Sequence, residues 1–233
     1  MEGRKVALLI NSFIFRALDE ELGHFIQGKR AEMAASKANI KRRNILELAL
    51  EDEDYGSQAS IQELIDQIKT FLFAGHDTSA SMVAWTYYYL SRYPDQLAKV
   101  REEHNVVLGA NSNPAYVAQL LSESPHLLQK LEYTMAVMRE ILRLQPMGDG
   151  ARQAPERYLI RTATGKELDA GDTMLCIQHQ TLHTDEDIWG ANALKFIPER
   201  FMHMSSIPEV FMPFSKRPRD CIGRTFAFLE VRF

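Results

Sequence analysis

The residue best placed to do chemistry in this sequence is Cys221, in a loop just before an expected helix. Pro213 and Pro218 disfavour regular structure ahead of it. Apolar residues recur at helical spacing from Ile222 onward and predict a helix there. A cysteine at a helix N-terminus lies close to unpaired backbone N–H groups and to the positive end of the helix dipole, which favour a thiolate.

The neighbours of Cys221 indicate what that thiolate could bind. The loop carries basic residues at Lys216, Arg217 and Arg219. Gly223 has no side chain, so a flat, bulky group could lie against the backbone there. A single thiolate in an aromatic- and arginine-containing loop suits the axial position of a heme iron. The alternative is a small buried hydrophobic residue, the usual state of a lone cysteine.

A second polar segment lies in the middle of a long apolar helix expected from Ile61 to Leu90. It reads Ala74-Gly-His-Asp-Thr-Ser79, and its glycine alone costs a helix interior about 1 kcal/mol. The Thr78 hydroxyl could donate a hydrogen bond to the Ala74 carbonyl. That bond would open the hydrogen-bond ladder of the helix and form a groove. Such a local conflict hints at function, and the alternative is a polar helix interface.

A third pattern pairs Glu140 with Arg143 on one face of an expected helix. An isolated pair of this kind is common on solvated helices and is worth a few tenths of a kcal/mol. Further along stands the segment Pro198-Glu-Arg-Phe201, which carries Arg200.

In their order and spacing, these segments resemble the cytochrome P450 family of heme-thiolate monooxygenases. The loop Phe214-x4-Arg-x-Cys-x-Gly223 is similar to the heme-binding loop of that family, and residues 74–79 are similar to its oxygen-binding helix. The remaining two motifs are similar to its Glu-x-x-Arg and Pro-Glu-Arg-Phe segments. The chain departs from the family at Arg217, where a glycine that supports a tight turn is usual.

The resemblance implies a site that holds heme b. Cys221 would be the axial ligand of the iron, and Phe214 would pack near the ligating sulfur. Arg219 would bind one heme propionate and Arg152 a second one. Gly223 would let the following helix approach the porphyrin.

The resemblance also implies roles on the long helix and in the charged cluster. Thr78 would order water at the oxygen site and Asp77 would relay protons, while Ala74 and Gly75 would leave room for dioxygen. A cluster with a structural, non-catalytic role would be formed by Glu140, Arg143 and Arg200, joined by bidentate guanidinium–carboxylate hydrogen bonds.

The activity implied is a monooxygenase that inserts one atom of O2 into a small apolar organic substrate. Its electrons would come from a reductase, either an NADPH-dependent flavoprotein or a ferredoxin type. One alternative is a heme-thiolate isomerase, dehydratase or peroxygenase on the same fold. Another is an inactive, truncated fragment that does not hold heme.

The expected fold is mainly α with a small β region, a partial cytochrome P450 fold. The resemblance covers residues from about 40 to 233. Residues 1–233 would then be the carboxy-terminal part of a single heme-thiolate domain, with the amino-terminal half absent.

Composition limits the remaining function classes. A net charge of −4 and the lack of a basic run argue against nucleic-acid binding. Two cysteines make no disulfide framework and favour a reducing compartment. No apolar run approaches the roughly 18 residues that a membrane span needs. For a full-length eukaryotic parent, the resemblance implies the endoplasmic reticulum membrane with a cytoplasmic catalytic domain.

A rival hypothesis is a zinc site at Cys176, His179 and His183, whose spacing is typical of part of such a site. No fourth ligand has a matching spacing, and Cys176 lies within a strand-like run. The His183 segment also resembles a structural segment of the same family.

Periodicity and turn residues predict the elements that position these side chains. Residues 1–50 are expected to be helical, with an apolar stripe that includes Leu18, Leu22, Phe25 and Ile26. Ser60 and Glu63 are expected to form a capping box. Further helices are expected at about 94–108, 116–121 and 126–144, strands at 157–161 and 173–177, and turns at 164–165 and 168–171.

Overall fold

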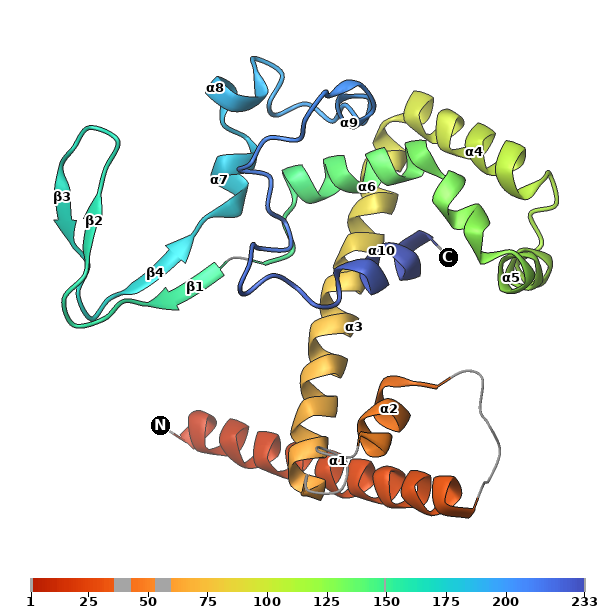
Figure 1. Ribbon diagram of the computed structural model, residues 1–233, viewed down its shortest axis with the longest axis vertical. Helices are drawn as coiled ribbons and strands as arrows, with labels where there is room; N and C mark the ends of the chain where they lie inside the picture. Colours follow the sequence, from red (N-terminus) through yellow and green to blue (C-terminus); the bar gives the residue numbers. More distant parts are fainter. Residues whose placement is uncertain (1, 36–42, 53–59, 149, 233) are drawn as a thin grey trace. The chain divides into compact units, whose positions relative to one another are not determined.

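The computed structural model describes residues 2–35, 43–52, 60–148 and 150–232 (Figure 1). The described chain is mainly helical, with two small two-stranded sheets, and it divides into two compact units, residues 1–74 and 75–233. No helix among the described residues combines the length and the apolar character that crossing a membrane requires.

The first unit contains α1 (Glu2–Ala35), α2 (Ile45–Glu51) and the beginning of α3 (Ile61–Arg92). Its core is formed by Ile26, Leu46, Leu64 and Ile65. The predicted apolar stripe is only partly right: Ile26 is fully buried, whereas the side chain of Phe25 is 57% exposed. The part of the predicted helical region at 36–42 lies outside the described residues.

Two capping boxes begin helices in this unit. The predicted box is confirmed: the Glu63 backbone N–H donates to Ser60 Oγ at 3.2 Å, and the Ser60 N–H donates to Glu63 Oε2 at 2.7 Å. A second box joins Asn44 and Glu47 at the start of α2. Asn44 and Glu47 are also three residues apart, so the capping-box spacing in the sequence could have predicted this second box.

Helix α3 is α-helical throughout, so the helix continues through residues 74–79. Threonines elsewhere in α3 explain why such residues are tolerated. Thr86 Oγ1 donates to the Met82 carbonyl at 2.8 Å while the helix continues past it. A hydroxyl can share a carbonyl with the ladder without opening it, and flanking apolar turns offset the weak helix formers.

The second unit continues with α4 (Pro94–Leu108), α5 (Pro114–Glu123), the 3-10 helix η1 (Pro125–Lys130) and α6 (Glu132–Leu144). The predicted 94–108 helix is confirmed. The helix predicted over 126–144 is instead divided at Leu131, whose φ of −81° and ψ of 68° leave the helical region. Leu131 is fully buried in a core with Leu108, Leu121 and Leu128, which fixes the bend.

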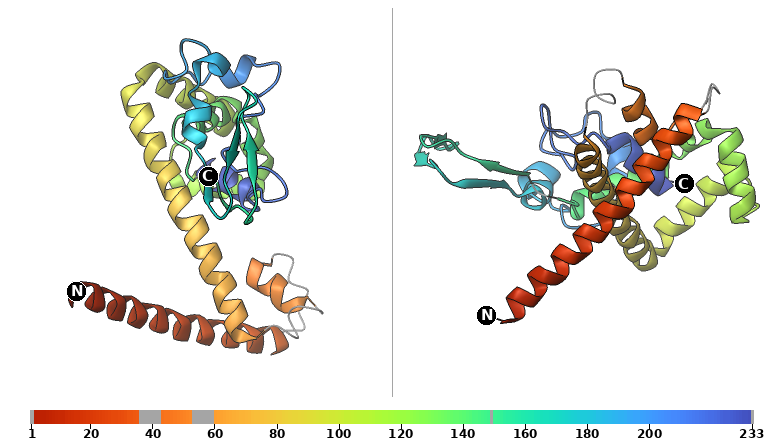
Figure 2. Two further views of the ribbon diagram at one scale, coloured as in Figure 1. Left: turned by 90° about the vertical axis from the view of Figure 1, so that its left-hand side faces the viewer. Right: turned by 90° about the horizontal axis from the view of Figure 1, so that it is seen from below.

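The β region consists of two antiparallel pairs. Strand β1 (Gly150–Gln153) pairs with β4 (Met174–Ile177), and β2 (Leu159–Arg161) pairs with β3 (Glu167–Asp169). Gly165, at φ 81°, confirms the turn predicted there. The turn predicted at 168–171 is partly wrong, because Leu168 pairs with Ile160 across the hairpin. This hairpin projects from the helices of the second unit (Figures 1 and 2).

Short helices complete the second unit: α7 (His179–His183), α8 (Glu186–Trp189), α9 (Arg200–His203) and α10 (Arg224–Arg232). Helix α6 contacts α4, α7, α9 and α10, and nearly its whole second half is buried. Because of these contacts, α6 is the element around which the other segments of this unit are placed.

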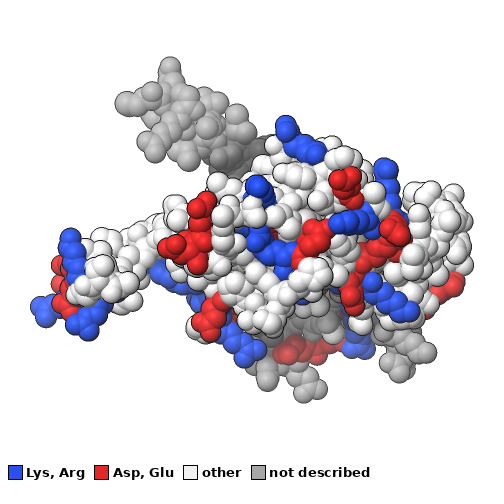
Figure 3. Space-filling view, turned by 90° about the horizontal axis from the view of Figure 1, so that it is seen from above, with Lys and Arg blue, Asp and Glu red and all other residues white. Residues whose placement is uncertain are grey.

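On the face seen in Figure 3, basic and acidic side chains are interspersed.

Candidate functional site

The loop before α10 folds back on itself and brings Cys221 to Phe214. The Cys221 N–H donates to the Phe214 carbonyl at 2.9 Å. The loop residue in the left-handed region is Ser215, at φ 62°, and Arg217 is not left-handed. The loop therefore turns without a glycine at position 217, where the family usually has one.

Helix α10 begins at Arg224 and not at Ile222, so Cys221 lies ahead of the first helical turn. The Arg224 N–H still reaches the Cys221 carbonyl at 3.4 Å, and the Ala227 N–H donates to the Gly223 carbonyl at 2.8 Å. The reason for the later start is that residues 222 and 223 form a turn that leads into the helix. Cys221 is exposed, so the alternative of a buried hydrophobic cysteine is wrong.

Gly223 lies directly beside the thiol. A Cβ built on Gly223 would meet Cys221 Sγ at 3.7 Å. The apolar side chains of Ile222 and Phe226 are 85% and 62% exposed. Phe214 packs its ring on Phe228 with centroids 5.1 Å apart. The thiol is thus exposed, and a side chain at position 223 would begin in van der Waals contact with the sulfur.

The two basic residues expected to bind propionates both reach solvent. Arg219 is exposed, and so is Arg152, which stands opposite Leu175 on β1. Arg152 Nη1 donates to the Ala151 carbonyl at 2.7 Å. Within the described residues neither arginine forms an ion pair, so each charge is available to an anionic group.

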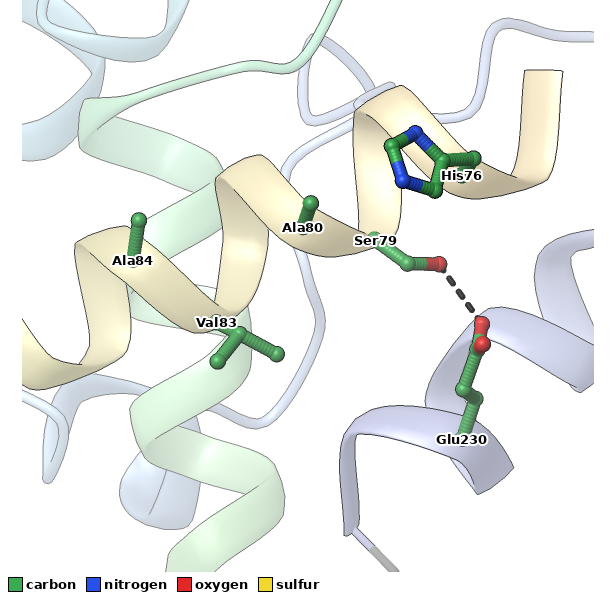
Figure 4. A pocket seen from close by; sticks show the side chains of 6 residues that line it. All are labelled: His76, Ser79, Ala80, Val83, Ala84 and Glu230. Atoms are coloured by element: carbon green, nitrogen blue, oxygen red, sulfur yellow. Dashed lines mark hydrogen bonds between the residues drawn. The ribbon is translucent and has the colours of Figure 1, made fainter. Parts of the chain in front are cut away.

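Helix α3 presents Asp77 and Thr78 as exposed side chains. Other residues of α3 line a groove together with Glu230 of α10 (Figure 4). The volume of the groove is about 430 Å³, and its lining residues are His76, Ser79, Ala80, Val83, Ala84 and Glu230. Ser79 Oγ donates to Glu230 Oε2 at 2.7 Å across it. Cys221 is not among the lining residues. The structure therefore brings α3 to the helix that follows the cysteine loop, and not to Cys221 itself.

Ser79 and Glu230 had no role assigned from sequence. The signal for Glu230 is a carboxylate that follows the apolar stretch Phe226-Ala-Phe-Leu229. Ser79 is buried while its neighbours Thr78 and Ala80 are exposed. Spacing places Ser79 on a particular face of α3, but its partner is 151 positions away and cannot be found from local pattern.

Glu140 and Arg143 form a fully buried pair on α6. Arg143 Nε and Nη2 each donate to a different carboxylate oxygen of Glu140 at 2.8 Å. Arg143 also donates to the carbonyls of His183, Ala193 and Lys195 at 2.7, 2.6 and 3.1 Å. A guanidinium has five N–H donors, and all five are used here. The pair joins α6 to the segment that follows α7.

Arg200 approaches this cluster without the expected bidentate geometry. Its Nε lies 3.7 Å from Glu140 Oε1 and has no hydrogen-bond acceptor among the described residues. Its other nitrogens donate to the carbonyls of Trp189 and Asn192 at 3.1 and 3.0 Å. Glu140 Oε1 instead accepts the Ile197 N–H at 2.9 Å. Backbone carbonyls therefore take the hydrogen bonds of Arg200, and a backbone N–H takes Glu140 Oε1. Arg200 contributes charge but no hydrogen bond to Glu140.

The zinc hypothesis fails on geometry. Cys176 is exposed on β4, while His179 and His183 are buried on α7 with ring centroids 5.8 Å apart. The described residues contain no group of three His, Cys, Asp or Glu side chains that could hold a metal ion. His183 Nε2 accepts the Met212 N–H at 3.1 Å, which gives the residue a packing role.

Comparisons with known proteins agree with the arrangement of motifs. The Cytochrome P450 family profile matches residues 12–233. The chain is 32% identical to the cytochrome P450 monooxygenase acrF of Aspergillus aculeatus, over 96% of this chain and 50% of that protein. It is also 32% identical to the 7-deoxyloganic acid hydroxylase of Catharanthus roseus, over 81% of this chain and 34% of that protein.

A third relative is a bifunctional cytochrome P450/NADPH–P450 reductase of Bacillus subtilis, 32% identical over 79% of this chain and 16% of that protein. The chain thus spans half or less of the length of these relatives. The match of the family profile over nearly the whole sequence means that this chain belongs to the cytochrome P450 family.

Proposed function

We propose that this chain carries the thiolate-ligand part of a heme-dependent monooxygenase, and that residues 1–233 are the carboxy-terminal part of its single heme-thiolate domain. The observation that carries the proposal is the exposed Cys221 thiol on a loop closed onto Phe214, in a chain of the cytochrome P450 family. The thiolate is the form of cysteine that ligates iron, and an exposed sulfur is accessible to a heme iron.

The residues around Cys221 fit heme b. A Cβ at position 223 would lie in van der Waals contact with Sγ, and a longer side chain would cover the sulfur further, so glycine there leaves room for a flat group. The exposed apolar side chains of Ile222 and Phe226 suit the apolar body of a porphyrin. Arg219 and Arg152 are exposed cations that could each hold a propionate by a charge-assisted hydrogen bond.

When bound, the heme would supply the activation of O2, and the protein would supply the ligand, the cavity and the path for protons. Cys221 would donate electron density to the iron. Asp77 would exchange protons with solvent from its exposed position on α3, and Thr78 would hold a water by its hydroxyl. A Cβ built on Gly75 meets no atom within 4 Å, which leaves space beside that turn of the helix, where Ala74 is also small.

The names of the relatives support hydroxylation over the isomerase, dehydratase and peroxygenase alternatives. They include a 7-deoxyloganic acid hydroxylase and a cytokinin hydroxylase. Two others combine the cytochrome with an NADPH–P450 reductase. We therefore propose that the substrate is a small apolar organic molecule, that O2 is the oxidant, and that a reductase supplies the electrons.

The test is the carbon monoxide difference spectrum of the reduced, heme-reconstituted chain. Cys221→Ser removes the proposed ligand, and Cys176→Ser is the matched control because Cys176 is also an exposed free cysteine. We expect a strongly red-shifted Soret band in the parent chain and in the control, and its loss in Cys221→Ser. A band that survives in Cys221→Ser, or no such band from a chain shown to be folded by circular dichroism, would refute thiolate ligation.

A further inference from the structure

A second hollow in residues 75–233 lies apart from the cysteine loop. Its volume is about 380 Å³, and its lining residues include Gln129, Glu132, Arg139, Phe201 and Arg232. Two of these are arginines from different helices, Arg139 on α6 and Arg232 on α10. Both side chains are partly buried. Neither has a role in the function proposed above.

The positive charge of these arginines is not neutralised within the described residues. Arg232 Nε and Nη1 donate to the carbonyls of Phe228 and Leu128 at 2.7 and 2.8 Å, and these acceptors carry no net charge. Arg139 has no ion pair in the described part of the chain. Glu132 lines the same hollow, but its exposed carboxylate forms no ion pair with either arginine.

Burial and a neighbouring arginine disfavour the charged state of each of these two side chains. Burial, followed by the charge of Arg224, lowers the pKa of Arg139. Burial, followed by the charge of Arg139, lowers the pKa of Arg232. Like charges that are partly withdrawn from water disfavour the charged state, and an anion between them reverses that effect. The apolar part of the lining, which includes Phe201, reduces the screening by water.

We propose that this hollow is a binding site for an oxyanion, either a phosphate or a carboxylate group, held by Arg139 and Arg232. A guanidinium matches both groups with paired N–H donors, whereas a point charge does not. Gln129 lines the hollow and adds an amide group that can donate to the ligand. The site requires no heme, so its test is independent of the function proposed above.

The experiment measures the thermal midpoint of the chain against millimolar inorganic phosphate or acetate, with chloride keeping the ionic strength constant. A ligand of the folded state raises the midpoint progressively as its concentration exceeds the dissociation constant. We expect a rise with phosphate, with acetate or with both, and the pattern identifies the preferred oxyanion. The rise should disappear in Arg139→Gln and persist in Arg101→Gln, which changes an exposed arginine on α4.

Two further results keep the proposal open to refutation if a variant loses stability. Without ligand, Arg139→Gln should have a midpoint no lower than the parent chain, because it removes repulsion among the arginines. Arg139→Lys should bind the oxyanion more weakly than the parent but more tightly than Arg139→Gln. The proposal is wrong if neither oxyanion raises the midpoint beyond chloride, or if Arg139→Gln responds as strongly as the parent chain.

Discussion

At the scale of single residues, His183 is a buried imidazole held in its neutral form. Its side chain is completely buried, and its Nδ1 has no hydrogen-bond partner in the part of the chain that the structure describes. Burial, and then the nearby His179, lower the pKa of His183 to about 4. The neutral ring accepts the Met212 N–H, and its own carbonyl accepts from Arg143. Protonation would place a charge beside the buried guanidinium.

This pKa predicts how stability depends on pH. The unfolded chain binds a proton at His183 near pH 6.5, whereas the folded chain does not until about pH 4. The contribution of neutral His183 to the free energy of unfolding is therefore fully present above pH 6.5 and is lost as the pH falls toward 4. We expect the free energy of unfolding to fall by about 1.4 kcal/mol per pH unit over this range, and by about 3 kcal/mol in all. Urea unfolding measured from pH 7 to pH 4 gives the slope.

His183→Gln should flatten this slope, because glutamine can accept the Met212 N–H but does not titrate. His126→Gln changes an exposed histidine and should leave the slope as it is in the parent chain. Equal slopes in the parent and His183→Gln would show that other groups account for the pH dependence.

Residue spacing predicted part of the charged cluster and missed the rest for a physical reason. The i,i+3 rule places Glu140 and Arg143 on one face of α6, and the structure pairs them. The rule carries no information about the carbonyls of Ala193 and Lys195, because these are set by the path of an irregular segment. For the same reason the position of Arg200 could be anticipated, but not its hydrogen bonds to carbonyls.

At the scale of elements, the N-terminus of α6 is capped by a residue of another helix. Leu131, at the N-cap position, supplies no side-chain hydrogen bond. Glu103 of α4 supplies them instead: it accepts the N–H groups of Tyr133 and Thr134 at 2.6 and 2.8 Å and the Thr134 hydroxyl at 2.7 Å. A carboxylate there satisfies unpaired N–H groups and complements the helix dipole.

We predict that Glu103→Ala lowers the free energy of unfolding by about 1–3 kcal/mol, because the variant leaves two backbone N–H groups of α6 without their acceptor. Urea unfolding followed by circular dichroism measures the loss. Glu102→Ala, an exposed neighbour on α4, should change stability by less than about 0.5 kcal/mol. Similar losses in the two variants would mean that Glu103 does not act as a cap.

The contrast between caps shows which element boundaries the sequence can reveal. The box at Ser60 and Glu63 is local, so a spacing of three residues was enough to predict it. The start of α6 depends on a carboxylate 30 positions earlier, and so the sequence pattern extended that helix back to residue 126. The apolar periodicity continues through η1 and hides the division at Leu131.

At the scale of the second compact unit, contacts between distant segments set the position of the candidate site. Cluster contacts place Met82 of α3 with Met138 and Leu142 of α6, and Phe214 and Phe228 pack against them. The hydrogen bond from Ser79 to Glu230 joins α3 to α10 beside this core. The motifs predicted the family to which these segments belong, but nothing local predicted that α3 and α10 meet through this pair.

We predict that Ser79 and Glu230 are energetically coupled. Ser79 is only 9% exposed, so Glu230→Ala leaves its hydroxyl without the carboxylate acceptor, and Ser79→Ala removes the donor. Each variant should lower the free energy of unfolding by about 1–2 kcal/mol. The double variant should lose about 1 kcal/mol less than the sum of the two single losses, because either single change already breaks the hydrogen bond between these residues. Urea unfolding of the four chains completes the cycle, with Glu209→Ala as an exposed control. Additive losses would show that α3 and α10 are held together by their apolar contacts alone.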